Sequence, residues 1–374
     1  MNRYYNPVQT ICGSGAVAEI PSLLEKVLTP GAGVLLITWD GNVAKEKSFA
    51  QLKENFRVHT VLFNESNPTV EQLFALYSET ADLAPEAVVA VGGGSVMDVG
   101  KSLCCFYGRK IASADEMRRI MIEKDYGVPQ TKWIGVPTTA GTGSEVTCWA
   151  TIWDSPNKAK YSVDTPQNYA YAAVVDPGLA ASMPMKLAVS SALDAVAHAA
   201  ESYWAKASNA VSKALALQAI RTVMENIDEL LANSGSRAAH DAMAKGSMLA
   251  GLAFSNTRTT ACHSISYPLT MQCHIPHGVA VSLLMGPVLE LNQPAIEDLD
   301  QLLDAFGVNE PYQVGVRITA ILEAAGHPVR LTRWGASEEM LPELVAHSMT
   351  KGRADNNPVE LTETVVYNIL KSIL

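Results

Sequence analysis

The sequence predicts an α/β domain built on a parallel sheet, followed by an all-helical domain. Short β-branched runs alternate with helical stretches in the first half of the chain, whereas almost no strand pattern follows the segment from Val174 to Pro177. Strands separated by helices of this length form βαβ units, which give parallel sheets. We therefore expect an α/β domain over residues 1–177 and an all-α domain over residues 178–374.

Four apolar runs in the first half are expected to be buried strands. They are apolar almost throughout, which is typical of strands in a sheet covered on both faces. The runs are residues 33–38, 58–63, 87–91 and 132–136. Helical periodicity lies between them at residues 18–27, 43–56 and 70–80.

Helical patterns continue through the second half, where proline and glycine residues separate them. The expected helices are residues 187–204, 210–232, 238–254, 279–291, 296–306, 312–325, 338–349 and 361–373.

Composition narrows the class of protein. The chain has 374 residues, of which 48% are hydrophobic and 18% charged, as expected of a compact globular protein with two sizeable cores. A net charge of -10 without Lys or Arg runs argues against nucleic acid or a membrane surface as partner. No stretch has the length of a membrane span or signal peptide. The 6 cysteines form no CxxC pair, so we expect reduced thiols and a cytoplasmic protein.

A glycine loop joins the third expected strand to the next helix. Residues 92–95 (GGGS) precede a helix that carries Asp98 and Lys101. Glycines let the backbone approach a phosphate closely, and the helix N-terminus favours its negative charge. A simple tight turn would need the same residues, and the glycine cluster alone does not distinguish the two.

A second loop, after the fourth expected strand, favours the phosphate interpretation. Residues 137–145 (PTTAGTGSE) offer several hydroxyl donors and two glycines. Two such loops at the carboxyl ends of parallel strands suit a dinucleotide, and neither has the Walker spacing of a nucleoside triphosphatase. Asp40 follows the first of the four strands, where an acidic residue bonds a ribose 2′-hydroxyl and repels a 2′-phosphate. We therefore expect NAD(H) in preference to NADP(H).

Asp194 and His198 lie four residues apart in an apolar helical stretch and therefore share a face. A buried carboxylate and imidazole need partners, and a simple Asp–His hydrogen bond would satisfy this pair. His263 and His277 bring the set to three histidines and one carboxylate, which suits iron or zinc and disfavours calcium. The spacing alone does not place the four side chains together.

Several ordered motifs resemble the iron-containing (group III) alcohol dehydrogenase family across nearly the whole chain. They are GGGSVMDVGK, PTTAGTGSEVT, VVDP, DAVAH and the histidine pair that ends in PHG. The resemblance implies a dinucleotide-binding domain and a helical domain in a dehydroquinate-synthase-like architecture. It also implies a metal-dependent NAD(P)H oxidoreductase that interconverts a small aldehyde and its primary alcohol. We expect Fe2+ as the native metal, with Zn2+, Mn2+ or Ni2+ as replacements.

The resemblance assigns roles to residues of this sequence. The implied metal ligands are Asp194, His198, His263 and His277. The expected cofactor contacts are Gly92, Gly93, Gly94, Ser95, Thr138, Thr139, Thr142 and Lys160, to which we add Asp40 and Asp98.

One position departs from the family pattern. Many members have a further histidine one helical turn after the third ligand, and this sequence has Tyr267 there. The departure puts the family's histidine-assisted proton route in doubt. Tyr267 itself and His274 in the following loop are the candidates for that role, although a single loop histidine is more often simply exposed.

The segment from Asn256 to Pro268 looks like the branch of the family that reduces phosphonoacetaldehyde or sulfoacetaldehyde. A phosphonate or sulfonate head needs cations, and Arg258 and Arg353 are the candidates. Lys351 is better explained as a surface charge.

The alternatives are a short-chain primary alcohol dehydrogenase of the same family, an enzyme like glycerol dehydrogenase or dehydroquinate synthase, and a nucleotide-binding protein without activity. Because all four ligand-type residues are present, the sequence favours an enzyme. We expect it to act on a small molecule as a homodimer.

Overall fold

The computed structural model describes residues 3–154, 156–157 and 159–374. Its internal contacts divide the chain into two compact units. The sheet unit consists of Asn6–Thr139 and Ser144–Leu179, and the helical unit consists of Ala140–Gly143 and Ala180–Leu374 with the described residues before Asn6. The short segment Ala140–Gly143 thus belongs to the helical unit, although it lies well before residue 177, where the sequence predicts the boundary.

Six parallel strands form the main sheet in the order β1-β8-β5-β4-β2-β3. The strands are β1 (Gln9–Cys12), β2 (Gly33–Thr38), β3 (Arg57–Leu62), β4 (Ala87–Gly92), β5 (Lys132–Pro137) and β8 (Ala172–Val175). Because they run in one direction, the loops after β2, β4 and β5 lie at the same edge of the sheet. Asp40, Gly93 and Thr138 belong to these three loops.

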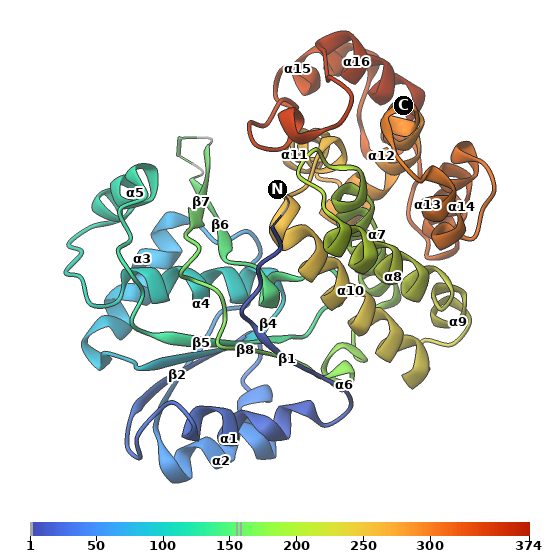
Figure 1. The fold of residues 1–374 in the computed structure, drawn as a ribbon. Coiled ribbons are helices and arrows are strands. Elements are labelled where there is room, and N and C mark those ends of the chain that lie inside the picture. Colours follow the sequence, from blue (N-terminus) through green and yellow to red (C-terminus); the bar gives the residue numbers. More distant parts are fainter. Residues whose placement is uncertain (1–2, 155, 158) are drawn as a thin grey trace. The chain divides into compact units, whose positions relative to one another are not determined.

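Side chains of each strand alternate between the two faces of the sheet. Val34 and Leu36 of β2 belong to a core cluster with residues of α1 (Ile20–Glu25) and α2 (Lys47–Asn55). Ile37 lies on the opposite face, near Gly100 of α4 (Gly94–Phe106). Figure 1 shows α1 and α2 on one side of the sheet, with α3 (Val70–Thr80) and α4 on the other. Both faces are therefore covered, which explains the apolar strands.

A hairpin of β6 (Trp149–Asp154) and β7 (Ala159–Asp164) completes the sheet unit, together with α5 (Ala114–Glu123). The short helix α6 (Pro177–Ala180) ends this unit, and its last residue is the first of the long segment of the helical unit. The buried carboxylate of Asp154 accepts hydrogen bonds from Arg118 Nε of α5 at 2.7 Å and from the Tyr161 hydroxyl of β7 at 3.0 Å. These charge-assisted contacts fasten α5 to the hairpin.

The helical unit is built around α7. Its helices are α7 (Met185–Trp204), α8 (Ala210–Met224), α9 (Ile227–Ala232), α10 (Arg237–Thr257), α11 (Ala261–Cys273), α12 (His277–Asn292), α13 (Leu299–Phe306), α14 (Pro311–Ala324), α15 (Leu341–Ala346) and α16 (Glu363–Ser372). Residues 192–204 of α7 are all buried, since α8, α10 and α12 pack against it. A helix that is apolar over most of its circumference is expected to take such a central place.

The structure confirms the predicted fold class, and the four predicted strands are present as β2, β3, β4 and β5. The prediction that all four are buried was wrong for β3, which lies at the edge of the sheet and is largely exposed. Several helix predictions were wrong. Residues 43–56 and 338–349 each form a 3₁₀ turn followed by a shorter helix, α2 and α15 respectively. Residues 210–232 form two helices, and Asn226 at the break bonds its side chain to the Thr222 carbonyl, in competition with the helix. Residues 261–273, for which the sequence predicted no helix, form α11 with Pro268 inside it. Proline disfavours a helix interior, but here the burial of residues 261–266 outweighs that cost.

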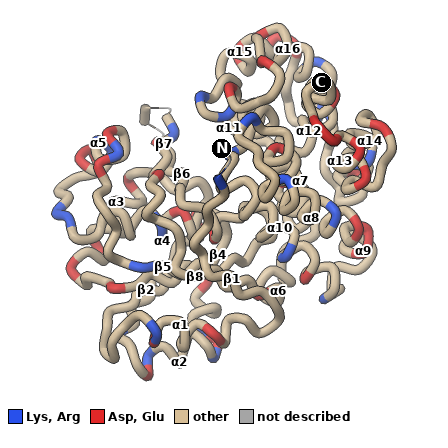
Figure 2. Tube along the Cα trace, viewed as in Figure 1, with Lys and Arg blue, Asp and Glu red and all other residues tan. Residues whose placement is uncertain are grey.

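Charged residues are sparse in the sheet. Figure 2 shows its strands with few coloured positions, and β2, β4 and β8 contain no Lys, Arg, Asp or Glu. Across the part of the chain that the structure describes, no helix combines the length and apolar character needed to cross a membrane.

Candidate functional site

Asp194 and three histidines converge inside the helical unit. The Oδ2 of Asp194 lies 3.8 Å from Nδ1 of His198, one turn further along α7. Its Oδ1 lies 3.5 Å from Nε2 of His263 on α11 and 3.9 Å from Nε2 of His277, the first residue of α12. Ligand-type atoms of Asp194, His263 and His277 all lie within 4.8 Å of one another. The His198 and His263 rings lie 4.3 Å apart between centroids.

Three atoms of this cluster are buried without a hydrogen-bond partner. They are Asp194 Oδ1, His198 Nδ1 and His263 Nε2. An unpaired buried polar atom costs about 1–3 kcal/mol, so native proteins rarely keep several together without a ligand. One carboxylate oxygen and two imidazole nitrogens facing one another are a donor set that a divalent transition metal satisfies. The residues therefore fit the implied metal.

Burial and mutual charge shift the pKa values in this cluster. Burial lowers the pKa of His198 to about 4. Burial opposes ionisation of Asp194, but the three neighbouring histidines outweigh it and hold the pKa of that carboxyl below its usual range. Burial also acts to lower the pKa of His263, but the carboxylates of Glu201 and Asp194 raise it to about 10. The cluster thus keeps a carboxylate at its centre.

Glu201 is a site residue that the sequence reasoning missed. Its fully buried carboxylate accepts a short hydrogen bond from His263 Nδ1, and burial, which opposes its ionisation, is outweighed by His263, so the pKa of Glu201 is lowered. Its spacing from Asp194 and His198 could have revealed it in the sequence, because residues at i, i+4 and i+7 share one helix face. Asp194, His198 and Glu201 have this spacing and are the only Asp, Glu or His residues of α7.

The start of α12 approaches α7 closely at Gly278. A β-carbon there would lie 2.3 Å from the Ser190 carbonyl oxygen and 3.4 Å from Asp194 Cβ. Only glycine permits this approach. It brings the neighbouring residue, His277, beside Asp194, which gives the PHG motif a physical reason.

Tyr267 and Arg353 extend the cluster beyond His277. The Tyr267 ring is nearly parallel to that of His277, at 7° and with centroids 6.0 Å apart. The Arg353 guanidinium carbon lies 5.4 Å from the centre of the Tyr267 ring, and its Nε donates to Thr259 Oγ1 at 3.1 Å. Arg353 forms no ion pair with any carboxylate among residues 3–154, 156–157 and 159–374. The structure therefore brings an arginine and the tyrosine together next to a cluster residue.

Arg258 and His274 have unusual backbone conformations. Arg258 joins α10 to α11 with φ 65° and ψ -179°, a region that essentially only glycine populates. His274 ends α11 in the left-handed conformation, and its side chain is exposed. Within the described residues, His274 is not among the ion-pair partners of Asp194.

The predicted cofactor loops adjoin one another in the sheet unit. The amide of Thr138 donates to the Gly92 carbonyl at 3.0 Å, and a β-carbon at Gly93 would lie 3.4 Å from the Thr139 side chain. Ser95, in the first turn of α4, accepts from the Asn67 amide at 3.2 Å. Backbone groups at the start of this helix thus lie beside the hydroxyls after β5, an arrangement suited to a phosphate.

A buried lysine supports these loops. Lys101 of α4 is fully buried and donates to Ser144 Oγ at 2.7 Å, Thr147 Oγ1 at 2.9 Å and the Trp149 carbonyl at 2.9 Å. Burial lowers its pKa to about 8. Asp98 accepts from Ser144 Oγ at 3.1 Å and from the Thr151 amide at 3.0 Å. In this structure Asp98 therefore holds the loop, and Lys101 is a second support that the sequence reasoning left without a role.

The other expected cofactor residues occupy three separate places. Asp40 accepts from the Asn42 amide at 2.8 Å in the turn after β2. The Lys160 ammonium lies 5.4 Å from the centre of the Trp153 ring in the hairpin. Thr142 lies in the Ala140–Gly143 segment of the helical unit.

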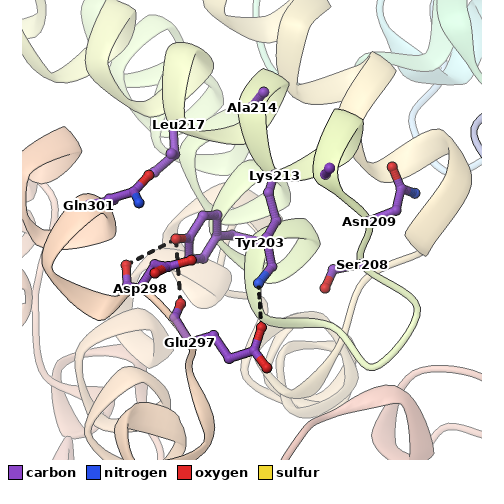
Figure 3. Close-up of a pocket in the computed structure, with 10 residues that line it drawn as sticks. Tyr203, Ser208, Asn209, Lys213, Ala214, Leu217, Glu297, Asp298 and Gln301 are labelled. Carbon is purple, nitrogen blue, oxygen red and sulfur yellow. Dashed lines mark hydrogen bonds and ion pairs between the residues drawn. The ribbon is translucent and has the colours of Figure 1, made fainter. Parts of the chain in front are cut away.

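A separate cavity of about 470 Å³ lies at the carboxyl end of α7, between α8 and α13 (Figure 3). Several of its polar groups already have partners within the protein. The Tyr203 hydroxyl donates to the Asp298 carbonyl at 3.0 Å, Lys213 lies 3.5 Å from the Glu297 carboxylate, and Asn209 caps α8. Because these groups are satisfied within the protein, the cavity does not compete with the Asp194 cluster as the candidate site.

The fold and the cluster together define a metal-containing oxidoreductase with a dinucleotide-binding sheet, and comparison with known families agrees. The chain belongs to the iron-containing alcohol dehydrogenase family. The family described as "Iron-containing alcohol dehydrogenase" matches residues 7–177, and "Fe-containing alcohol dehydrogenase family, C-terminal" matches residues 188–374.

Individual relatives are similar along most of the chain. Phosphonoacetaldehyde reductase of Streptomyces viridochromogenes is 29% identical over 318 residues, covering 81% of this chain and 80% of the relative. Choline dehydrogenase of Bacillus subtilis is 30% identical over 363 residues, covering 91% and 87%. The crystal structure of sulfoacetaldehyde reductase from Bifidobacterium kashiwanohense in complex with NAD+ superposes with a TM-score of 0.89 at 25% identity, covering 100% of this chain and 98% of that one.

We expect Gly278→Ala to destabilise the protein by about 1–3 kcal/mol, because the new β-carbon overlaps the backbone of Ser190 and forces α12 away from α7. Urea unfolding of the metal-free protein measures the change. Gly235→Ala is the control, since its nearest neighbour would be a side-chain oxygen at 3.7 Å. Equal unfolding free energies for the two variants would contradict the close approach.

Proposed function

We propose that the protein is a metal-dependent and nicotinamide-dependent reductase of small aldehydes that carry an anionic head. The observation that carries the proposal is the cluster around Asp194, with three unpaired buried ligand atoms and Arg353 two rings away. Asp194, His198, His263 and His277 are the proposed ligands. A divalent metal held there supplies a Lewis acid that polarises a carbonyl oxygen, and a nicotinamide supplies the hydride.

The proposed cofactor is NAD(H), with its phosphates over Gly93, Gly94 and Ser95. Thr138, Thr139, Thr142 and Lys160 are the other proposed contacts, and Asp98 acts by holding the loop. The adjoining loops after β4 and β5 support this assignment, as does the NAD+ complex of the similar sulfoacetaldehyde reductase. Asp40 favours NAD(H) over NADP(H), because a carboxylate after β2 repels a 2′-phosphate.

The anionic head is argued from charge near the cluster. A dry site needs a cation for such a head, because an unpaired buried anion costs several kcal/mol. Arg353 supplies this cation from the face of Tyr267, and its planar guanidinium matches a phosphonate or sulfonate. The same cation would repel choline, on which the similar dehydrogenase of Bacillus subtilis acts. We therefore rank Arg353 ahead of Arg258 as the anchor.

Two residues are proposed for the proton route. Tyr267 packs on the ring of His277 and so lies beside the cluster. His274 is exposed after α11, where it meets bulk water. The contact with His277 favours Tyr267.

The metal assignment predicts that His263→Ala loses at least about tenfold in Zn2+ affinity, equivalent to about 1.4 kcal/mol. Competition with a chromophoric chelator measures the affinity. His274→Ala, on an exposed histidine outside the cluster, should bind like the wild type. A His263→Ala protein that keeps one tightly bound metal per chain would exclude the ligand set.

The cofactor assignment predicts that Gly93→Val raises the dissociation constant of NADH by more than about tenfold, or about 1.4 kcal/mol. The side chain would point toward Thr139 and fill the space between the two loops. Fluorescence titration measures binding, and thermal unfolding without cofactor checks that the variant is folded. An unchanged constant would place the dinucleotide elsewhere.

The substrate assignment predicts that Arg353→Ala loses activity toward anionic aldehydes but not toward an uncharged one. The ratio kcat/KM for phosphonoacetaldehyde and sulfoacetaldehyde should fall by about tenfold or more, or about 1.4 kcal/mol, while that for propanal changes less than about twofold. Lys351→Ala is the matched control, two residues away on an exposed side chain. If the wild-type enzyme prefers propanal, the proposal that the substrate carries an anionic head is wrong. If kcat/KM of Arg353→Ala falls by the same factor for all three aldehydes, Arg353 is not the anchor.

A further inference from the structure

We propose that Glu201 is a positioning residue, which fixes the ring of His263 so that Nε2 and not Nδ1 is presented to the metal. The inference rests on the proposed ligand set, because His263 must be a ligand for its orientation to matter.

The Glu201 carboxylate contacts both the ring and the backbone amide of His263. One carboxylate oxygen, Oε2, accepts the hydrogen bond from the ring Nδ1. The other, Oε1, accepts from the His263 amide at 3.3 Å, the Cys262 amide at 2.6 Å and the Thr260 hydroxyl at 2.9 Å. The carboxylate thus orients the imidazole and also fixes the main chain from which it projects.

These contacts also hold the beginning of α11. Thr260 precedes the helix without capping it through its own side chain, so the first amides would lack partners. Glu201 of α7 accepts from two of them, and a negative charge there is favoured by the helix dipole. Arg258, two residues before Thr260, has a strained backbone. An external carboxylate is therefore needed to hold this turn and the helix start in register.

The bond made by one ring nitrogen decides which nitrogen remains for a metal. Because Nδ1 of His263 donates to Glu201, its Nε2 is turned toward Asp194, 3.5 Å away, and has no hydrogen-bond partner. If Nδ1 were released, the ring would be free to turn and the Nε2 lone pair would no longer be held at the cluster. Glu201 lies on the same helix face as Asp194 and His198, so α7 carries two proposed ligands and the residue that orients a third.

Glu201→Gln separates this role from general support of the fold. The amide oxygen can still accept from Cys262 and His263, but the amide nitrogen is a donor and cannot accept the Nδ1 proton. The favoured tautomer then carries its proton on Nε2, which cannot bind a metal. We expect the Zn2+ affinity to fall by about 10- to 100-fold, the range found for such supporting carboxylates. The unfolding transition of the metal-free protein should stay close to that of the wild type.

Tyr203→Phe is the matched control. Tyr203 is two residues further along α7 and is buried, but its hydroxyl bonds the Asp298 carbonyl at the other cavity (Figure 3). Like Glu201→Gln, the Tyr203→Phe variant changes one polar group at a buried position of α7. Its Zn2+ affinity should change less than about twofold. A Glu201→Gln protein that binds Zn2+ as tightly as Tyr203→Phe would overturn the proposal.

A measurement on the wild type keeps the test valid if Glu201→Gln does not fold. In protein labelled with 15N-histidine and loaded with Zn2+, His263 should show a downfield proton on Nδ1 and metal coordination at Nε2. The signal is assigned by its absence from His263→Gln. Coordination at Nδ1, or an Nδ1 without a proton, would overturn the proposal. Tight Zn2+ binding by His263→Ala would instead overturn the ligand set itself, so the two failures are distinguishable.

Discussion

The central constraint in this molecule is a row of ionisable side chains on a buried helix. Asp194, His198 and Glu201 lie on one face of α7, where water cannot solvate them. Each must find partners on other elements, because an unpaired polar group in such a place costs as much as a good hydrogen bond contributes. The positions of α11 and α12 follow from this need, since their first turns carry His263 and His277.

In each of the two units, one buried charged side chain holds the loop or turn beside the proposed site. In the sheet unit the buried ammonium of Lys101 binds three oxygen acceptors, one near the end of the second cofactor loop and two in the chain after it. In the helical unit the buried carboxylate of Glu201 collects donors from Thr260, just before α11, and from Cys262 and His263 in the first turn of α11. A buried charge is costly unless it is fully paired, so each one fixes the geometry of its partners. Neither needs to touch a substrate to be essential for the site.

Periodicity predicted most of the fold, and its failures have physical causes. The continuous apolar strands β2 and β4 could be recognised because both their faces are buried. The strands β1 and β8 have four residues each, too few for a pattern, and α11 was hidden by Pro268. Chemistry made Asp194 and the three histidines candidate ligands, and only the resemblance to the family joined them into one set. The pairing of Tyr267 with Arg353 could not be predicted, because only the folded chain brings these distant segments together.

Hydrogen bonds between two distant segments of the chain fix the positions of both His263, the proposed ligand, and Arg353, the proposed anchor. Residues 348–356 are tied to α11 and the turn before it: Ser264 Oγ accepts from the Thr350 amide at 2.9 Å, and Asn356 donates to the Thr257 and Thr259 carbonyls at 2.8 Å and 3.1 Å. Arg353 lies within this segment. Its guanidinium is therefore held at a set position relative to His263, one residue before Ser264. A substrate with its carbonyl and anionic head a fixed distance apart can exploit such a frame, because neither group has to be ordered on binding.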